Sequence, residues 1–197
     1  LGQDSRAGDP GHRAGISLSR LRNCAEGITD GVQGVRNRNG IAEYGRTFMT
    51  FHCQGPQVTS EFYHSEPWLD VNALQTQWGN ARICDTKHKA YGMLVGLINT
   101  AYSTSPYKPV LNLEACYENH THARPPCPGE LKEAWHMRLE AFWGLLSGAA
   151  GHVYGGDGLW DARSTSASSG FFTSMSYNQA INEDGRDDMR WVRRSEE

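Results

Sequence analysis

The chain has 197 residues, which is long enough to bury one substantial hydrophobic core. Hydrophobic residues make up 38% of it, and six Trp, eight Tyr and six Phe exclude an intrinsically disordered composition. A net charge of -3 without long runs of one sign gives no electrostatic reason to expect nucleic acid or an anionic membrane as partner. We therefore expect neither, and no stretch reaches the roughly 18 consecutive apolar residues of a membrane-spanning helix.

Short β-rich runs alternate with longer helical patterns along the chain. In chain order, hydrophobic periodicity predicts a helix over Ser17–Val32, a strand over Arg46–His52, a strand over Trp68–Gln75, a helix over Thr86–Tyr102, a strand over Lys108–Glu114, a helix over Leu131–Leu146 and a short strand over Gly151–Gly156. Residues 162–197 are polar and irregular, which predicts a linker and a charged tail for which disorder is one option. The alternation predicts a parallel sheet, either doubly wound or closed into a (β/α) barrel.

In both architectures functional side chains gather at the C-terminal ends of the strands, which is where Glu114 falls. A carboxylate ending the apolar run PVLNLE is costly to desolvate unless it is paired or used in chemistry. An ion pair with a neighbouring Arg or Lys and a role as nucleophile or acid/base both remain open. Glycoside hydrolysis needs a second carboxylate facing the first. The pattern does not choose among Asp4, Glu61, Glu66, Asp70, Glu118 and Asp157.

Aromatic side chains in or beside the strand-end loops suit sugar binding, because they present flat apolar faces and hydrogen-bonding edges. They are Trp68, Trp78, Tyr117, Tyr154 and Trp160, although packing is the preferred interpretation for Trp68. Metal-ligand residue types occur in two places, around His120–His122 with Cys116 and Cys127, and at His52 with Cys53. Their spacings match no common zinc pattern, so we expect neither a metal nor another cofactor.

Four sequence blocks in order carry a resemblance to a known family. RTFMTFHCQG, SEFYHSEPWLDVNALQTQ, KPVLNLEACYE and LLSGAAGHVYGGDGLWD resemble the apiosidase-like glycoside hydrolases, a family of TIM-barrel proteins. The resemblance covers Leu1–Asp161 and implies part of a (β/α)8 barrel, roughly strands four to eight, followed by an irregular C-terminal tail over residues 162–197. The resemblance implies that LGQDS ends strand four, and that FMTFH is strand five, LDVNALQ strand six, VLNLE strand seven and GHVYGG strand eight. The first half of the barrel would then be a partner of this chain.

The resemblance also implies roles for individual residues. Glu114 would be the nucleophile and Asp4 the general acid/base of a retaining glycosidase that acts on a plant or microbial polysaccharide. The residues expected to contact sugar hydroxyls or to hold Glu114 in place are His52, Asn72, Gln75, Tyr117, Glu118, Tyr154 and Trp160. Arg138 matches a family arginine for which a structural role is expected.

Departures from the family pattern keep alternatives open. GQD replaces the usual GGD beside Asp4, and Gln75–Trp78 replaces a QSGH segment, which removes an active-site His. A catalytically inactive carbohydrate-binding or truncated homologue is therefore the main alternative, and a metal-dependent hydrolase is a weaker one. Half a barrel would expose two sheet edges, so we expect the isolated chain to be poorly stable, to aggregate or to dimerise. The compartment stays open, although secretion is plausible for the full-length protein.

Overall fold

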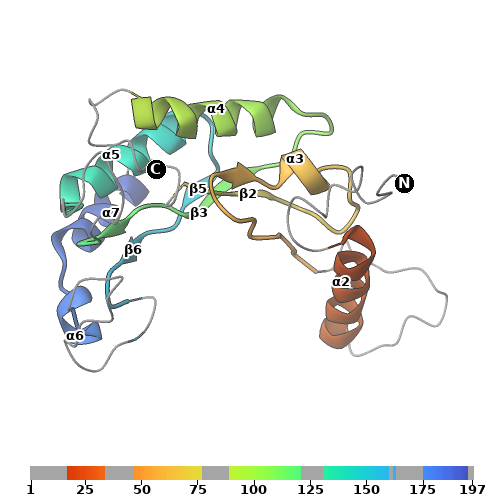
Figure 1. The fold of residues 1–197 in the computed structure, drawn as a ribbon, viewed down its shortest axis with the longest axis horizontal. Coiled ribbons are helices and arrows are strands. Elements are labelled where there is room, and N and C mark those ends of the chain that lie inside the picture. Colours follow the sequence, from red (N-terminus) through yellow and green to blue (C-terminus); the bar gives the residue numbers. More distant parts are fainter. Residues whose placement is uncertain are drawn as a thin grey trace, which may run out of the picture.

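The fold is that of a computed structural model, which describes residues 17–33, 47–76, 89–120, 131–159, 162 and 175–194. Helices and short strands alternate along most of these segments (Figure 1). The elements in chain order are α2 (Leu18–Gln33), β1 (Gln57–Val58), α3 (Ser60–Tyr63), β2 (Asn72–Gln75), α4 (Lys89–Ser103), β3 (Val110–Glu114), β4 (Tyr117–Glu118), α5 (Ala134–Leu146), β5 (Gly151–His152), β6 (Gly155–Gly156), α6 (Tyr177–Ala180) and α7 (Asp184–Arg194).

The main sheet has four strands in the order β1-β2-β3-β5. β2, β3 and β5 run parallel, whereas β1 pairs antiparallel with β2. A second, two-stranded sheet pairs β4 with β6 in parallel. Parallel neighbours require crossover connections, and α4 and α5 supply them between β2, β3 and β5. The predicted α/β class with a parallel sheet is therefore confirmed, while the assignment to barrel strands four to eight stays a prediction.

Helices α4 and α5 lie on the same side of the main sheet (Figure 1). Leu94 and Ile98 are four residues apart on α4, so they share one face of the helix and pack onto Leu74 and Val110 of the strands. All four side chains are at most 1% exposed, which makes this layer the principal core. Among the described helices, none combines the length and the apolar character needed to cross a membrane.

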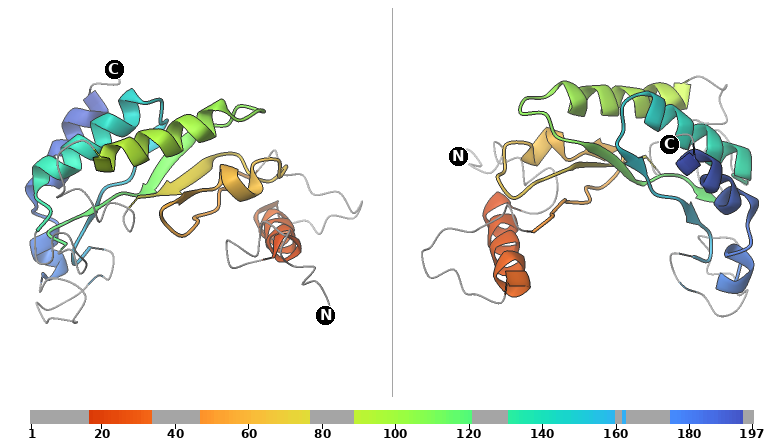
Figure 2. Two further views of the ribbon diagram at one scale, coloured as in Figure 1. Left: turned by 45° about the horizontal axis from the view of Figure 1, so that its top comes forward. Right: turned by 180° about the vertical axis from the view of Figure 1, so that it is seen from behind.

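Helix α2 lies at the opposite end of the molecule from α6 and α7 (Figures 1 and 2). Its Ala25 packs in a second cluster with Tyr63 and Trp68, which is 3% exposed. The Arg22 guanidinium donates two hydrogen bonds to the Glu66 carboxylate, at 2.7 and 2.8 Å, and the Trp68 indole donates a third at 3.1 Å. The expected packing role of Trp68 is confirmed.

Two predicted strands differ from their expected form. Within the predicted strand Arg46–His52, the described residues from Thr47 onward contribute only an isolated parallel bridge between Thr50 and Val71, because the Asp70 carboxylate accepts the Met49 amide at 2.7 Å in place of a ladder partner. The segment Gly151–Gly156 divides into β5 and β6, which belong to different sheets.

The C-terminal segment after residue 161 corrects the sequence-based prediction of an irregular tail, because its described part forms α6 and α7. Asp184 and Asp187 lie in the first turn of α7 and Arg193 and Arg194 in its last turn, which complements the helix dipole. Helix α7 packs against α5, where the Arg138 guanidinium pairs with Asp188. That ion pair agrees with the structural role expected for Arg138.

Glu118 attaches this C-terminal segment to the sheet. One carboxylate oxygen accepts the Tyr154 hydroxyl at 2.6 Å, and the other accepts the Gly185 amide of α7 at 3.1 Å. A Cβ at Gly185 would lie 2.3 Å from that carboxylate, so a side chain at this position would displace the Glu118 carboxylate.

We expect Glu118→Gln to loosen α7. The glutamine amide would face a donor and leave it unsatisfied, at a cost of about 1–3 kcal/mol for a buried group. Hydrogen exchange of the α7 amides measures the effect, and Glu26→Gln on the exposed side of α2 is the matched control. Unchanged exchange of α7 in Glu118→Gln would contradict this attachment.

Candidate active site

The C-terminal ends of β2 and β3 bring Gln75 and Glu114 together. The two strands pair in parallel through Asn72–Val110, Ala73–Leu111 and Leu74–Asn112, and then Gln75 pairs with Glu114. One residue of β3, Leu113, is therefore skipped at a register shift. Bulges of this kind re-aim side chains near the edges of sheets. Here the shift makes Glu114, rather than Leu113, the neighbour of Gln75.

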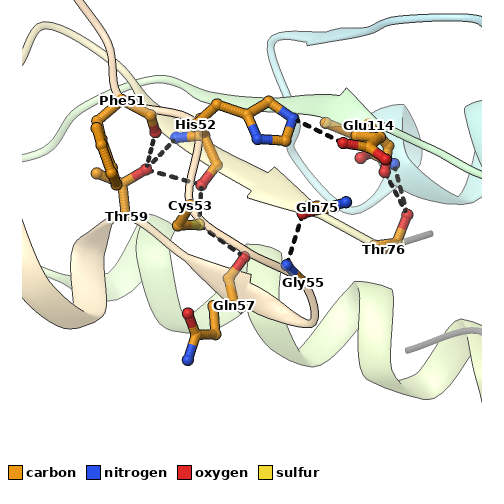
Figure 3. A network of polar contacts seen from close by, with 11 residues as sticks. Phe51, His52, Cys53, Gly55, Gln57, Thr59, Gln75, Thr76 and Glu114 are labelled. Carbon is orange, nitrogen blue, oxygen red and sulfur yellow. Dashed lines mark hydrogen bonds and ion pairs between the residues drawn. The ribbon is translucent and has the colours of Figure 1, made fainter. Parts of the chain in front are cut away.

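His52 faces Glu114 across the end of β2 (Figure 3). The His52 Nε2 atom lies 3.2 Å from Glu114 Oε2, and their side chains are 41% and 19% exposed. The pair is thus open to solvent on the histidine side and half-buried on the carboxylate side. Such a position allows a ligand to approach without leaving the carboxylate fully hydrated.

The chain segment that carries His52 is tied to β2 on both sides of the histidine. The Thr59 hydroxyl lies 2.9 Å from the Phe51 carbonyl oxygen (Figure 3). It also lies 2.8 Å from the Ala73 carbonyl oxygen of β2. The Cys53 sulfur lies 3.6 Å from the Ala73 carbonyl oxygen of β2 and 3.2 Å from the Gln57 carbonyl oxygen of β1. Burial raises the pKa of Cys53 to about 11, so this thiol stays protonated and acts as a structural donor.

The surroundings of Glu114 favour its ionised form. Burial raises the pKa of Glu114, but hydrogen bonds from His52, Tyr117 and Gln75 outweigh burial and hold the pKa below its usual value. The hydrogen bond to Glu114 raises the pKa of His52. Burial, and then the neighbouring Glu114 charge, raise the pKa of Tyr117, which stays a neutral donor.

Gln75 is oriented by a close backbone approach. Its side-chain oxygen accepts the Gly55 amide at 2.6 Å (Figure 3). The side-chain NH2 group is then the part of Gln75 that can donate to Glu114. A Cβ at Gly55 would lie 2.8 Å from the Gln75 carbonyl oxygen and 2.9 Å from its Cγ. Glycine at this position therefore permits the contact that fixes Gln75 beside Glu114.

Tyr117 is held by the glycines of the second sheet. It pairs with Gly155 in the β4–β6 ladder, and a Cβ at Gly155 would lie 2.2 Å from the Tyr117 ring. The ring thus occupies the space that a side chain at Gly155 would take. The packing of the Tyr117 ring therefore explains why Gly155, the first glycine of GG in GHVYGG, has no side chain.

The His52–Glu114 pair predicts a specific dependence of stability on pH. The raised pKa of His52 gives stability that is fully present below 6.5 and is lost as pH rises through the folded-state value. The lowered pKa of Glu114 gives stability that is present above 4.5 and is lost as pH falls through the folded-state value. We expect His52→Gln to lower the melting temperature most between pH 4.5 and 6.5.

Thermal unfolding followed by circular dichroism across this pH range measures the difference between the two proteins. Glu114→Gln provides the matched background, because replacing His52 there should remove no pH-dependent stability. An equal effect of His52→Gln in both backgrounds would contradict the coupling of the two residues.

The structure places three other predicted site residues, Asn72, Glu118 and Tyr154, in internal contacts. Asn72 is fully buried at the start of β2, where its side chain hydrogen-bonds His64, so it has no surface for a sugar and does not reach Glu114. Glu118 is 2% exposed and binds Tyr154 and the Gly185 amide, as described above. We therefore reassign these residues to the support of the fold. Asp4 and Trp160 lie outside the described residues.

The other carboxylates considered as a partner for Glu114 have different surroundings. Glu66 pairs with Arg22, and Asp70 accepts the Met49 amide. Asp157 is 1% exposed, and Glu61 lies on the exposed side of the short helix α3. Among the residues that the structure describes, no group of three or more His, Cys, Asp or Glu side chains could hold a metal ion.

One functional candidate was absent from the sequence-based set. Glu140 of α5 is 1% exposed and contacts the chain just after Gln75 and just after Glu114. It falls at i+3 from Met137 and directly before Ala141, in the buried stripe of the helix. A carboxylate within an apolar stripe is the sequence signal that could have identified it.

A family model described as "Apiosidase-like, catalytic domain" matches residues 6–196, so the chain belongs to this family. The match includes the C-terminal helices, which corrects the expected limit at Asp161, and it begins after Asp4.

Two solved structures share the fold. One is described as "Glycoside hydrolase" and has 22% sequence identity and a TM-score of 0.64, covering 75% of this chain and 35% of its own. The other is a glycoside hydrolase family 5 protein from Bacteroides vulgatus ATCC 8482, with 21% identity and a TM-score of 0.62, covering 74% of this chain and 32% of its own. The chain thus spans about a third of the length of these structures. A search of curated proteins gave no match.

Proposed function

We propose that this chain carries the nucleophile side of a retaining glycoside hydrolase site. The observation that supports the proposal is Glu114, a half-buried carboxylate at the end of a parallel strand, kept ionised by donors from three separate segments. A nucleophile needs this combination, because it must stay charged while being partly shielded from water. Membership of the apiosidase-like family supports the same assignment.

In the proposed mechanism a Glu114 oxygen attacks the anomeric carbon, and the bond from that carbon to the leaving oxygen breaks. A general acid gives its proton to the leaving oxygen, and the same group then takes a proton from the water that hydrolyses the glycosyl ester. Asp4 is the proposed acid/base, at about 5–5.5 Å from Glu114 in the reacting arrangement. His52, Gln75 and Tyr117 would contact the sugar or orient Glu114.

We propose a glycoside of a plant or microbial polysaccharide as the substrate, and no cofactor. The family description makes an aryl apioside a natural member of a panel of aryl glycosides. The remainder of the barrel, as a separate chain or a preceding segment, is the proposed partner that would complete the wall opposite Glu114.

The stereochemistry of hydrolysis tests the proposal. A dinitrophenyl glycoside suits the test, because its leaving group needs little protonation and the assay then depends on the nucleophile. Proton NMR of the first-formed sugar should show the anomeric configuration of the substrate. Inversion would refute Glu114 as a covalent nucleophile.

Asp4→Asn separates the two proposed roles. It should slow the hydrolysis of glycosides with poor leaving groups much more than that of the dinitrophenyl glycoside. Equal loss for both leaving groups would refute Asp4 as the acid. Saturable sugar binding without turnover of any leaving group would favour the alternative function, a catalytically inactive carbohydrate-binding homologue.

A further inference from the structure

A buried carboxylate on α5 lies against the ends of the two strands that carry Gln75 and Glu114. Glu140 is 1% exposed, and an ionised carboxylate is unfavourable there unless hydrogen bonds replace its water. Four donors surround it. They are the Thr76 hydroxyl, the Asn112 side-chain amide at 3.3 Å, the Cys116 amide at 3.0 Å and the Cys116 thiol at 2.6 Å.

These donors belong to both strand ends. Glu140 Oε1 accepts from Thr76, the residue that follows Gln75 after β2. Glu140 Oε2 accepts from Cys116, two residues beyond Glu114 after β3. The Thr76 amide in turn donates to the Glu114 carbonyl oxygen at 2.9 Å. A single carboxylate therefore connects the two chain segments that hold the proposed nucleophile and its neighbour.

The connection lies where the ladder between the strands is least regular. The register of β2 and β3 shifts between Leu74 and Gln75, and a bulge leaves one residue unpaired and bends the strand. The same shift brings Glu114 beside Gln75. Hydrogen bonds from outside the ladder are then needed to keep the bulge in one geometry, and Glu140 accepts such bonds from the residues just beyond it.

We propose that Glu140 is a positioning residue that holds Thr76 and Cys116 and thereby fixes Glu114 against His52. The inference rests on the proposed function, since it gives Glu140 its purpose as the support of the nucleophile. A reacting group must be held within about 0.5 Å of its productive position, which requires locked neighbours. Glu140 supplies this lock from the helix layer, without contact with the substrate.

Titration of His52 measures this positioning in the absence of any substrate. The pKa of His52 is raised above 6.5 by its hydrogen bond to Glu114, with 3.2 Å between the two atoms. NMR titration of the histidine-labelled 197-residue chain gives this pKa, with His52→Gln identifying the signal. We expect the value in Glu140→Gln to fall between those of the wild type and of Glu114→Gln, because glutamine keeps one acceptor oxygen and turns its NH2 group toward the donors of the other strand end, which displaces that end.

Two controls separate positioning from general stability. Ile98→Ala opens a cavity in the fully buried α4 core and should lower the melting temperature while leaving the pKa of His52 unchanged. Thr76→Val and Thr76→Ser form a matched pair that does not depend on the folding of Glu140→Gln. Thr76→Val removes the hydroxyl and should lower the pKa of His52, whereas Thr76→Ser should retain it.

The inference is overturned if Thr76→Val, or folded Glu140→Gln, leaves His52 with the wild-type pKa. It is equally overturned if Ile98→Ala lowers that pKa as much as Glu140→Gln does. Failure of the proposed function looks different, because the chain combined with the remainder of the barrel would then hydrolyse no aryl glycoside, while the titration of His52 still reports the position of Glu114.

Discussion

Glu114→Gln is expected to reduce kcat for an aryl glycoside by on the order of 10⁴-fold or more, as the loss of a covalent nucleophile does in other enzymes. Glutamine keeps the size of the side chain but cannot form the glycosyl ester. Initial-rate kinetics with a dinitrophenyl glycoside measure the effect. Glu61→Gln is the matched control, because Glu61 is an exposed glutamate on α3 and its replacement should leave kcat unchanged.

Glu114→Gly tests whether the lost step is the nucleophilic attack on the anomeric carbon, because a small external nucleophile can then replace the missing carboxylate. Azide can enter the space left by the side chain, attack the anomeric carbon and displace the aryloxide. The expected product is a glycosyl azide of the opposite anomeric configuration, with recovery of much of the lost rate. Full activity of Glu114→Gln, or no azide product from a folded Glu114→Gly, would contradict the assignment.

Gly155→Ala is expected to cause the largest loss of stability from a single added methyl group. The new Cβ would lie 2.2 and 2.4 Å from two atoms of the Tyr117 ring, so the ring or the β4–β6 pair must move. Overpacking of this kind costs about 1–3 kcal/mol. For a chain of this size each kcal/mol lowers Tm by roughly 2–4 °C.

Gly96→Ala on α4 is the matched control for the same substitution. Among the described residues nothing lies within 4 Å of a Cβ at Gly96, and the position is a helix interior. Alanine there should stabilise the protein by about 0.5–1 kcal/mol, because it restricts the unfolded chain. Differential scanning calorimetry of both variants measures the contrast, and equal melting temperatures would contradict the close packing of Tyr117 on Gly155.

Hydrophobic periodicity predicted the long helices and central strands within a few residues. The helix expected over Ser17–Val32 is α2, and the strand expected over Lys108–Glu114 contains β3. Helix α5 also forms where expected, but its apolar residues are not confined to its buried face. Leu146 is 86% exposed, while the buried residues of α5 are Met137, Glu140, Ala141 and Gly144. Apolar residues on two faces of that helix obscured which face meets the sheet.

The C-terminal helix α7 was missed because most of its residues are charged. Its buried side is small, and Gly185 and Val192 are its buried residues. The acidic first turn and basic last turn were the available signals. Its attachment through Glu118 depends on a partner 67 residues away, which no local pattern reveals.

The sequence predicted the central residue of the candidate site, Glu114, but not the contacts that hold this residue in place. Glu114, His52 and Gln75 follow from strand ends and family resemblance, and the structure brings these three together. Asn72 was predicted to lie near Glu114, but it begins the short strand that Gln75 ends. Its side chain therefore has different neighbours and hydrogen-bonds His64. The register shift beside Glu114 and the hydrogen bonds of Glu140 arise only when strands and helix assemble.

Covalent labelling of the nucleophile tests the central claim most directly. A 2-deoxy-2-fluoro glycoside with a dinitrophenyl leaving group forms a glycosyl ester that hydrolyses slowly, so the labelled peptide can be sequenced by mass spectrometry. The account predicts one sugar per chain, attached to Glu114, and no label in Glu114→Gln. A label on any other carboxylate, or turnover of the parent glycoside with inversion and no label, would contradict it.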